Sequence, residues 1–275
     1  MSTPARRSSG PLRRTGSALA LATVVLAAAG CGGTSSAAST DPDPQVISAG
    51  ELTVCTSLPY EPFEFERNGE TVGFEVDLAK AVAEELDLEP VFLNEDFDAV
   101  QSGQLLNDNL CDLAAAGLTI TGDRARVLDF SSPFFNAAQA LVVSGSAGIG
   151  SLDDLRGARI AVQSGSTGEL YVTDNAPRNA QVVPFDDIGE MSSALNGGTV
   201  DAGVYDNTVA GSAIQEYPAF RIAAEFDTGE QYGMAVKKDG NVDLLRVVND
   251  VIAELKADGG YDKLYATWFG GKKKS

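Results

Sequence analysis

Short apolar strands alternate with helices from Gly50 onward in this 275-residue chain. In the first helix Leu78, Val82 and Leu86 recur every four residues and charged residues lie between them, a pattern typical of an amphipathic helix. The elements predicted for this first round, in chain order, are a strand at 52–55, a helix through 78–86, a strand at 91–93, a helix at 97–106 and a strand at 113–116. Alternation on this scale predicts an α/β fold with parallel, doubly wound sheets.

The alternation starts afresh after Val143. The elements predicted here are a short helix at 152–155, strands at 159–162, 182–183 and 202–205, a return through 232–236 and a last long helix through 244–255. Gly259 is the expected end of that helix. Two similar lobes are therefore predicted, with residues 50–139 plus 233–271 in lobe 1 and 140–232 in lobe 2. A ligand cleft is expected at the carboxyl ends of both sheets.

Composition excludes several classes of function. The chain has 20 Lys plus Arg, 39 Asp plus Glu, no His and three Cys. Without His, a Ser-His-Asp hydrolase lacks its base, and a His/Cys zinc site lacks its ligands, so we expect no metal and no cofactor. The net charge of −19 argues against nucleic acid or an anionic lipid surface as the main partner. The class of function that these exclusions leave is an acidic protein that handles a small molecule.

The N-terminal residues resemble a secretory signal. Four arginines precede a largely apolar run over 18–29, which is too short to span a bilayer. The run ends in Ala28-Ala29-Gly30-Cys31, which resembles the lipobox of bacterial lipoproteins, although most lipoboxes carry Leu where this chain has Ala28. The prediction is a signal peptide over 1–30 that is cleaved before a lipidated Cys31. The alternative is an ordinary secretory signal with an incidental cysteine.

A polar segment rich in Gly, Ser, Asp and Pro follows, and we expect residues 31–49 to be the lipidated cysteine and a flexible tether. Cleavage would remove four arginines and no acid, which leaves 16 basic and 39 acidic residues and a net charge of −23. The mature protein would be exported and held at the outer face of the cell membrane by its lipid. Residues 272–275 are expected to be a basic, solvated tail.

Six short segments of the sequence carry a family resemblance: 60–65 (YEPFEF), 73–82 (GFEVDLAKAV), 116–121 (AGLTIT) with Arg124, 129–131 (DFS), 163–165 (QSG) and 268–270 (WFG). In this order they resemble the bacterial extracellular solute-binding proteins of family 3, which serve ATP-binding-cassette importers of polar amino acids. The resemblance implies a two-lobed periplasmic-binding-protein fold. It also implies a monomer that binds a free amino acid, closes about its hinge and docks on a membrane permease.

The resemblance also assigns roles at the ends of a bound amino acid. Arg124 would give a bidentate fork to the α-carboxylate. The amide of Thr119 and the helix start at Ser166 and Thr167 would add N–H donors. Asp206 would take the ammonium, with the Gly117 carbonyl and the Thr119 hydroxyl. Without the family resemblance, an arginine at position 124 is more often a solvated partner of Asp123 or Asp129, and an aspartate at position 206 is more often a helix N-cap.

Matching positions place Ser57, Tyr60, Phe97, Gln163 and Tyr205 around the ligand's side chain. Many relatives carry Asp where this chain has Ser57, and glutamine binders tend to have Lys where it has Gln163. The resemblance therefore implies neither a specificity for cationic amino acids nor one for glutamine. Because Arg124 is committed to the α-carboxylate, no candidate cation is left for an acidic side chain. We therefore expect a neutral polar amino acid first, a basic one second, and poor binding of glutamate and aspartate.

Three questions stay open at this stage. Cys55 and Cys111 fall in an oxidising compartment on strands that should be neighbours, but the sequence does not decide whether they are bridged. An enzyme of the same fold, such as a cyclohexadienyl dehydratase or a lytic transglycosylase, would need a carboxylic acid in the cleft, for which Glu61 and Glu95 are the candidates. A module that reports amino acids to a membrane kinase is the third reading. We favour a transport protein that is not an enzyme.

Overall fold

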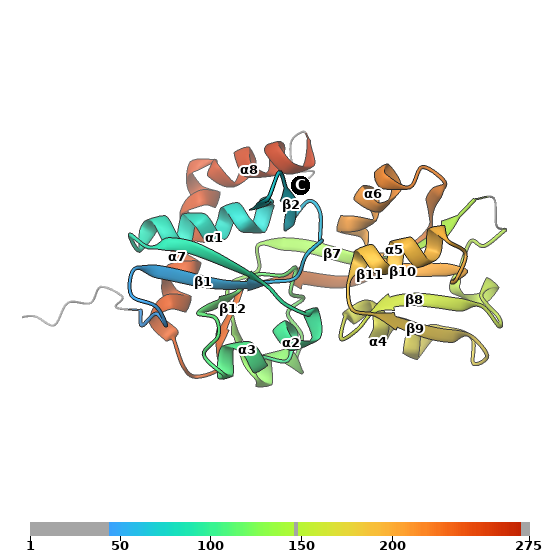
Figure 1. The fold of residues 1–275 in the computed structure, drawn as a ribbon, viewed down its shortest axis with the longest axis horizontal. Coiled ribbons are helices and arrows are strands. Elements are labelled where there is room, and N and C mark those ends of the chain that lie inside the picture. Colours follow the sequence, from blue (N-terminus) through green and yellow to red (C-terminus); the bar gives the residue numbers. More distant parts are fainter. Residues whose placement is uncertain (1–43, 146–147, 271–275) are drawn as a thin grey trace, which may run out of the picture. The chain divides into compact units, whose positions relative to one another are not determined.

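The computed structural model describes residues 44–145 and 148–270 and places them in two five-stranded sheets and one two-stranded sheet (Figure 1). The first sheet has the order β4 (Glu89–Asn94), β1 (Glu51–Thr56), β5 (Leu113–Ala114), β12 (Ala235–Lys237) and β6 (Leu128–Phe130). The second has the order β11 (Phe220–Tyr232), β7 (Phe135–Ser144), β10 (Ala202–Asp206), β8 (Arg159–Gln163) and β9 (Gln181–Phe185). The small sheet pairs β2 (Phe65–Arg67) with β3 (Glu70–Val72).

Helices cover both faces of each large sheet. Four helices pack on the first sheet, namely α1 (Phe74–Glu85), α2 (Phe97–Gln101), α3 (Gln104–Asn107) and α7 (Val242–Asp258), and α8 (Gly260–Phe269) packs on α1 and α7. With the second pack α4 (Thr167–Asn175), α5 (Ile188–Asn196) and α6 (Asn207–Glu216). We call each sheet with its helices a lobe, the first and the second. None of the helices within the described ranges is both long and apolar enough to cross a bilayer.

The strands bury alternate residues on opposite faces. In β1, Leu52 and Val54 join the cluster under α1 and α7, whereas Cys55 joins the cluster under α2 and α3. In β8, Ile160 and Val162 pack toward α4, while Ala161 faces the side of α5. Each lobe therefore has apolar core on both sides of its sheet, as the predicted α/β class requires.

The predicted parallel sheets are wrong in part, because both large sheets are mixed. The strands β4, β1 and β5 are parallel, as are β10, β8 and β9, but β12 runs antiparallel to β5 and β6, and β7 runs antiparallel to β10 and β11. The reason is the connection between lobes. The chain leaves the first sheet along β7 and returns along β11, and two strands that run there and back pair antiparallel (Figure 1).

The helix predicted over 97–106 is broken into two. Gly103 has φ 75°, a left-handed conformation that ends α2 and starts α3 and that favours glycine. The end predicted for the last long helix is confirmed, since α7 stops at Gly259 with φ 81°. A further helix, α8, follows directly and was not predicted.

A disulfide joins Cys55 to Cys111, which answers the question that the sequence left open. Their Cα atoms are 5.7 Å apart, within the range that a disulfide spans. The bridge ties β1 to the segment before β5 and closes a loop with a sequence separation of 56. In the chain-entropy model a loop of this size contributes roughly 4 kcal/mol to stability.

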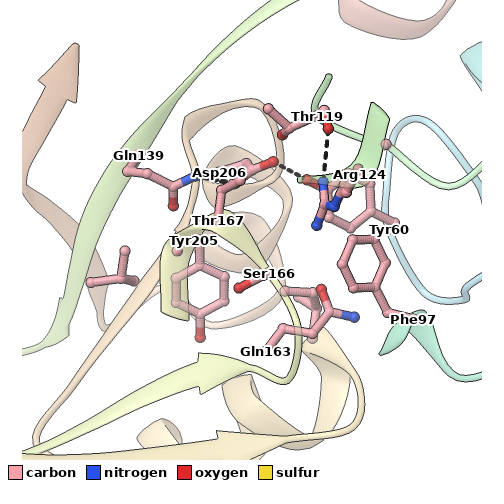
Figure 2. A pocket seen from close by; sticks show the side chains of 14 residues that line it. Tyr60, Phe97, Thr119, Arg124, Gln139, Gln163, Ser166, Thr167, Tyr205 and Asp206 are labelled. Atoms are coloured by element: carbon pink, nitrogen blue, oxygen red, sulfur yellow. Dashed lines mark hydrogen bonds between the residues drawn. The ribbon is translucent and has the colours of Figure 1, made fainter. Parts of the chain in front are cut away.

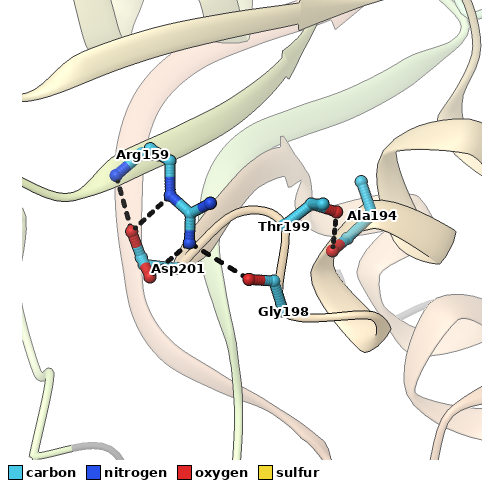
Figure 3. Close-up of polar contacts among 5 residues, drawn as sticks. All are labelled: Arg159, Ala194, Gly198, Thr199 and Asp201. Carbon is cyan, nitrogen blue, oxygen red and sulfur yellow. Dashed lines mark hydrogen bonds and ion pairs between the residues drawn. The ribbon is translucent and has the colours of Figure 1, made fainter.

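The start of β10 is held to β8 by an exposed ion pair (Figure 3). Arg159 Nη2 lies 3.1 Å from Asp201 Oδ1, and Asp201 Oδ2 accepts from the Arg159 backbone N–H at 2.8 Å and from Nε at 3.2 Å. Hydrogen bonds from Arg159 hold the pKa of Asp201 below its usual value. This pair lies at the opposite end of β10 from Asp206, and it supplies a surface control for the site below.

Candidate functional site

Ten of the eleven predicted substrate-binding residues line one pocket (Figure 2). They are Tyr60, Phe97, Gly117, Thr119, Arg124, Gln163, Ser166, Thr167, Tyr205 and Asp206. Ser57 is buried at the end of the β1 segment and is not among the lining residues. Side chains fill most of the pocket, and the remaining cavity volume is about 20 Å³, little more than one water requires.

The guanidinium of Arg124 is buried and fixed by three protein acceptors. Nη1 donates to the Thr119 carbonyl at 2.9 Å, Nη2 to the Gly165 carbonyl at 3.0 Å, and Nε to Gln101 Oε1 at 3.1 Å. Its Cζ lies 5.3 Å from the centre of the Phe97 ring. Burial lowers the pKa of Arg124, and the nearby carboxylates of Asp206 and Glu230 oppose that shift.

The alternative of a solvated Arg124 is not what the structure contains. Asp123 pairs instead with Arg126, at 2.7 Å, and Asp129 pairs with Lys238, also at 2.7 Å. The side chain of Arg124 is only 5% exposed. The pocket therefore holds a fixed cation that has no carboxylate salt-bridge partner among the described residues.

Asp206 ends β10 and occupies the N-cap position of α6, but its side chain makes no capping hydrogen bond. Its carboxylate instead accepts from Tyr60 Oη at 2.5 Å, from Gln139 Nε2 at 2.6 Å and from Tyr232 Oη. Burial raises the pKa of Asp206, and the charge of Glu230 adds to that shift. Tyr60 lies in the first lobe and Asp206 in the second, so this bond crosses between the lobes.

Gly117 approaches Tyr60 so closely that no side chain fits. It has φ 58°, and a Cβ built there would lie 2.5 Å from Tyr60 Cε1. Its backbone N–H donates to Glu75 Oε2 at 2.8 Å. The Thr119 hydroxyl donates to Glu230 Oε2 at 2.8 Å. The ammonium contact that the resemblance implies for the Gly117 carbonyl and the Thr119 hydroxyl stays a prediction.

The distal end of the pocket is polar on the second lobe and aromatic on the first. Gln163 Nε2 donates to the Asp186 carbonyl at 3.4 Å, and the Tyr205 hydroxyl lies 3.2 Å from Ser192 Oγ. Ser166 caps α4 by accepting from the Glu169 backbone N–H at 3.0 Å. Ser166 and Thr167, at the start of α4, both line the pocket.

Sequence reasoning missed four lining residues, Gln139, Gly168, Ile188 and Val204. Gln139 is fully buried in β7 within an apolar run, and a lone amide in such a run was the available signal. Its Nε2 also donates to Glu230 Oε1 at 3.0 Å, whereas its Oε1 has no hydrogen-bond partner. Glu230 gave no signal at all, because its sequence neighbourhood is polar.

Two further placements bear on the alternatives. Glu61 and Glu95, the carboxylic acids that an enzyme of this fold would need, do not line this pocket. Within the described residues, no group of three or more Asp, Glu or Cys side chains is arranged to hold a metal ion.

The chain is similar in sequence and in fold to known binding proteins. The chain is 30% identical over 259 residues to a probable histidine-binding protein of Neisseria gonorrhoeae, covering 92% of this chain and 94% of that one. It is 31% identical to arginine-binding protein 1 of an ABC transporter of Escherichia coli strain K12, covering 80% and 91%. A solved ancestral arginine-binding protein bound to glutamine matches with a TM-score of 0.77 and 42% identity, covering 82% and 100%.

The two-sheet α/β fold and these likenesses agree with the match of residues 52–271 to one family profile. The chain belongs to the bacterial extracellular solute-binding proteins, family 3.

Proposed function

We propose that this chain is the substrate-binding component of an ABC importer, and that it binds one polar amino acid between its lobes and delivers it to the membrane permease. The observation that carries the proposal is the pairing of a fixed cation, Arg124 of the first lobe, with a fixed carboxylate, Asp206 of the second, in one pocket. The relatives named for histidine and arginine support it.

A free amino acid offers a carboxylate and an ammonium group, and burying either without a partner is costly. Arg124 would exchange its carbonyl acceptors for the α-carboxylate, to which the N–H groups at the start of α4 would also donate. Asp206 would take the ammonium, and Gln139 Oε1 offers a further acceptor that now lacks a donor. Because the pocket is nearly filled, ligand entry requires the lobes to separate and these side chains to change partners.

The same residues predict specificity. Among the described residues that line the pocket, Arg124 is the one cationic side chain, and Asp206 and Glu230 lie close to it. Calorimetry with the common amino acids should therefore give measurable binding of a neutral polar or basic ligand, with glutamine and arginine as the first to test. Glutamate and aspartate should bind at least a hundredfold more weakly than the best ligand, because their second carboxylate has no cation. Glutamate as the tightest ligand would contradict this pocket. If no amino acid bound, the proposed function itself would fail.

The lipid anchor on Cys31 is a second element of the proposal. It lies outside the described residues and rests on the lipobox-like sequence before it. Protein expressed in a bacterial host that acylates lipoproteins should partition into the detergent phase and carry the added mass of acyl chains. Cys31→Ser should remain in the aqueous phase or keep its N-terminal 30 residues. Equal processing and membrane retention of wild type and variant would refute the anchor and leave the binding function intact.

A further inference from the structure

The carboxylate of Glu230 is surrounded by four donors, two on each oxygen. Oε2 accepts from Thr167 Oγ1 at 2.6 Å and from Thr119 Oγ1 at 2.8 Å, while Oε1 accepts from Thr228 Oγ1 at 2.7 Å and from Gln139 Nε2 at 3.0 Å. Hydrogen bonds to an ionised acceptor are roughly twice as strong as those between neutral groups. This side chain is therefore held firmly, although it does not line the pocket.

The donors come from different parts of the fold. Thr119 belongs to the first lobe, in the loop that follows β5, and Thr167 is the first residue of α4 in the second lobe. Glu230 itself lies on β11, near the point where this strand returns to the first sheet. One carboxylate on the connection between lobes thus bonds both lobes at once.

We propose that Glu230 is a latch that holds the lobes closed around the bound ligand. A carboxylate near the pivot moves little when the lobes rotate, so Thr119 and Thr167 reach it together only when the lobes are closed. Glu230 is a positioning residue, because it acts on two residues of the pocket wall and not on the ligand. The inference rests on the proposed function for its ligand, but the interlobe bond itself does not.

Glu230 and Asp206 differ in what a bound ligand would do to their hydrogen bonds. Asp206 lines the pocket and would give up protein donors for the ammonium group, whereas the partners of Glu230 are all protein groups that need not leave. Loss of the latch should then act after the ligand has bound, on how long the closed state lasts. An effect on the dissociation rate, with the association rate unchanged, is what separates a latch from a residue that shapes the pocket.

The test compares Glu230→Ala and Glu230→Gln with Thr228→Val, which removes one donor from the same carboxylate without touching the interlobe bonds. Stopped-flow kinetics would be measured with the amino acid that calorimetry identifies. We expect Glu230→Ala to dissociate at least tenfold faster with its association rate within twofold of wild type. Glu230→Gln, which keeps one oxygen for the two threonines, should show a smaller effect, and Thr228→Val should stay within twofold of wild type.

Spin labels at exposed positions of the two lobes, Lys80→Cys in α1 and Asn196→Cys in α5, would report the interlobe distance with and without ligand. Glu230→Ala should shift this distance distribution toward the open form, and its thermal midpoint would show that it is folded. Unchanged dissociation together with an unchanged distance distribution in Glu230→Ala or Glu230→Gln would overturn the latch. If wild type bound no amino acid, the proposed function would fail, and the label distances in ligand-free protein would still decide the inference.

Discussion

Replacing Arg124 with alanine is expected to weaken amino-acid binding at least a hundredfold while the ligand-free protein stays folded. The guanidinium is buried and bonded to protein acceptors that the α-carboxylate of a ligand would replace. Truncating one member of a buried charge pair costs roughly 3–5 kcal/mol, which is about two to three and a half decades in affinity. Isothermal titration calorimetry of the variant measures the loss directly.

Arg126 supplies a matched control on the same turn. It pairs with Asp123 at 2.7 Å, and both side chains are exposed. An exposed pair is worth under about 1 kcal/mol, so Arg126→Ala should leave the affinity within a few-fold of wild type. Arg124→Lys keeps the charge and loses the planar fork, and its affinity should lie between those of wild type and Arg124→Ala.

Asp206, which we propose binds the ammonium group of the ligand, is tested in the same way. Asp206→Ala should also cost at least a hundredfold, and it should weaken closure because the bond from Tyr60 crosses between the lobes. Asp201→Ala, at the exposed start of the same strand, should change affinity little. If either Arg124→Ala or Asp206→Ala bound within about threefold of wild type, the proposed site would be in the wrong place.

The elements that the sequence predicts, such as β1, α1, β8 and α7, follow from hydrophobic periodicity and glycine stops, which are local signals. The α7 end at Gly259 is an example. Strand direction is different, since it depends on where a chain goes after it leaves a sheet. The predicted lobe boundaries at 139/140 and 232/233 fall in β7 and at the end of β11, but nothing local in these segments shows that they pair antiparallel. The sequence shows that residue 103 is a glycine, but it does not show that this glycine adopts a φ of 75° and separates two helices.

The candidate site likewise contains residues that the sequence points to and residues that only the tertiary structure brings in. Arg124 belongs to a segment that matches the family's order, and the resemblance also assigns a role to Asp206, so the sequence already points to both residues, which line the pocket. Gln139 and Glu230 belong to the network only because the two crossing strands bring them beside Thr119 and Thr167. Hydroxyl partners are likewise set by tertiary structure, which is why the sequence did not predict the bond from Thr119 to Glu230.

Below the pocket lies a pair of carboxyl groups with no exposure to solvent, Glu64 and Glu75. As two carboxylates they would only accept, and three of their four oxygens have no donor; the fourth accepts from the Gly117 backbone N–H. A shared proton turns one group into a donor for the other. Burial raises the pKa of Glu75 to about 8, and burial beside the charge of Glu75 raises the pKa of Glu64 well above its usual value.

This pair should make the protein less stable as the pH rises. In the unfolded chain both groups lose their protons near pH 4.5, whereas the folded protein keeps at least one proton until about pH 8. The contribution of the pair is therefore fully present below pH 4.5 and is lost as the pH rises through the folded pKa. The free energy of unfolding should therefore fall as the pH rises from 5 to 8.

Glu75→Gln tests this directly, because the amide oxygen can still accept from Gly117 while the amide N–H₂ donates to Glu64 without a shared proton. The free energy of unfolding, measured with urea at several pH values, should depend much less on pH in the variant than in wild type. The variant should be the more stable protein at pH 8 and close to wild type at pH 5. Glu84→Gln, on the exposed face of the same helix, should follow the wild-type profile. A Glu75→Gln profile parallel to wild type across this range would show that the pair is not protonated in the folded protein.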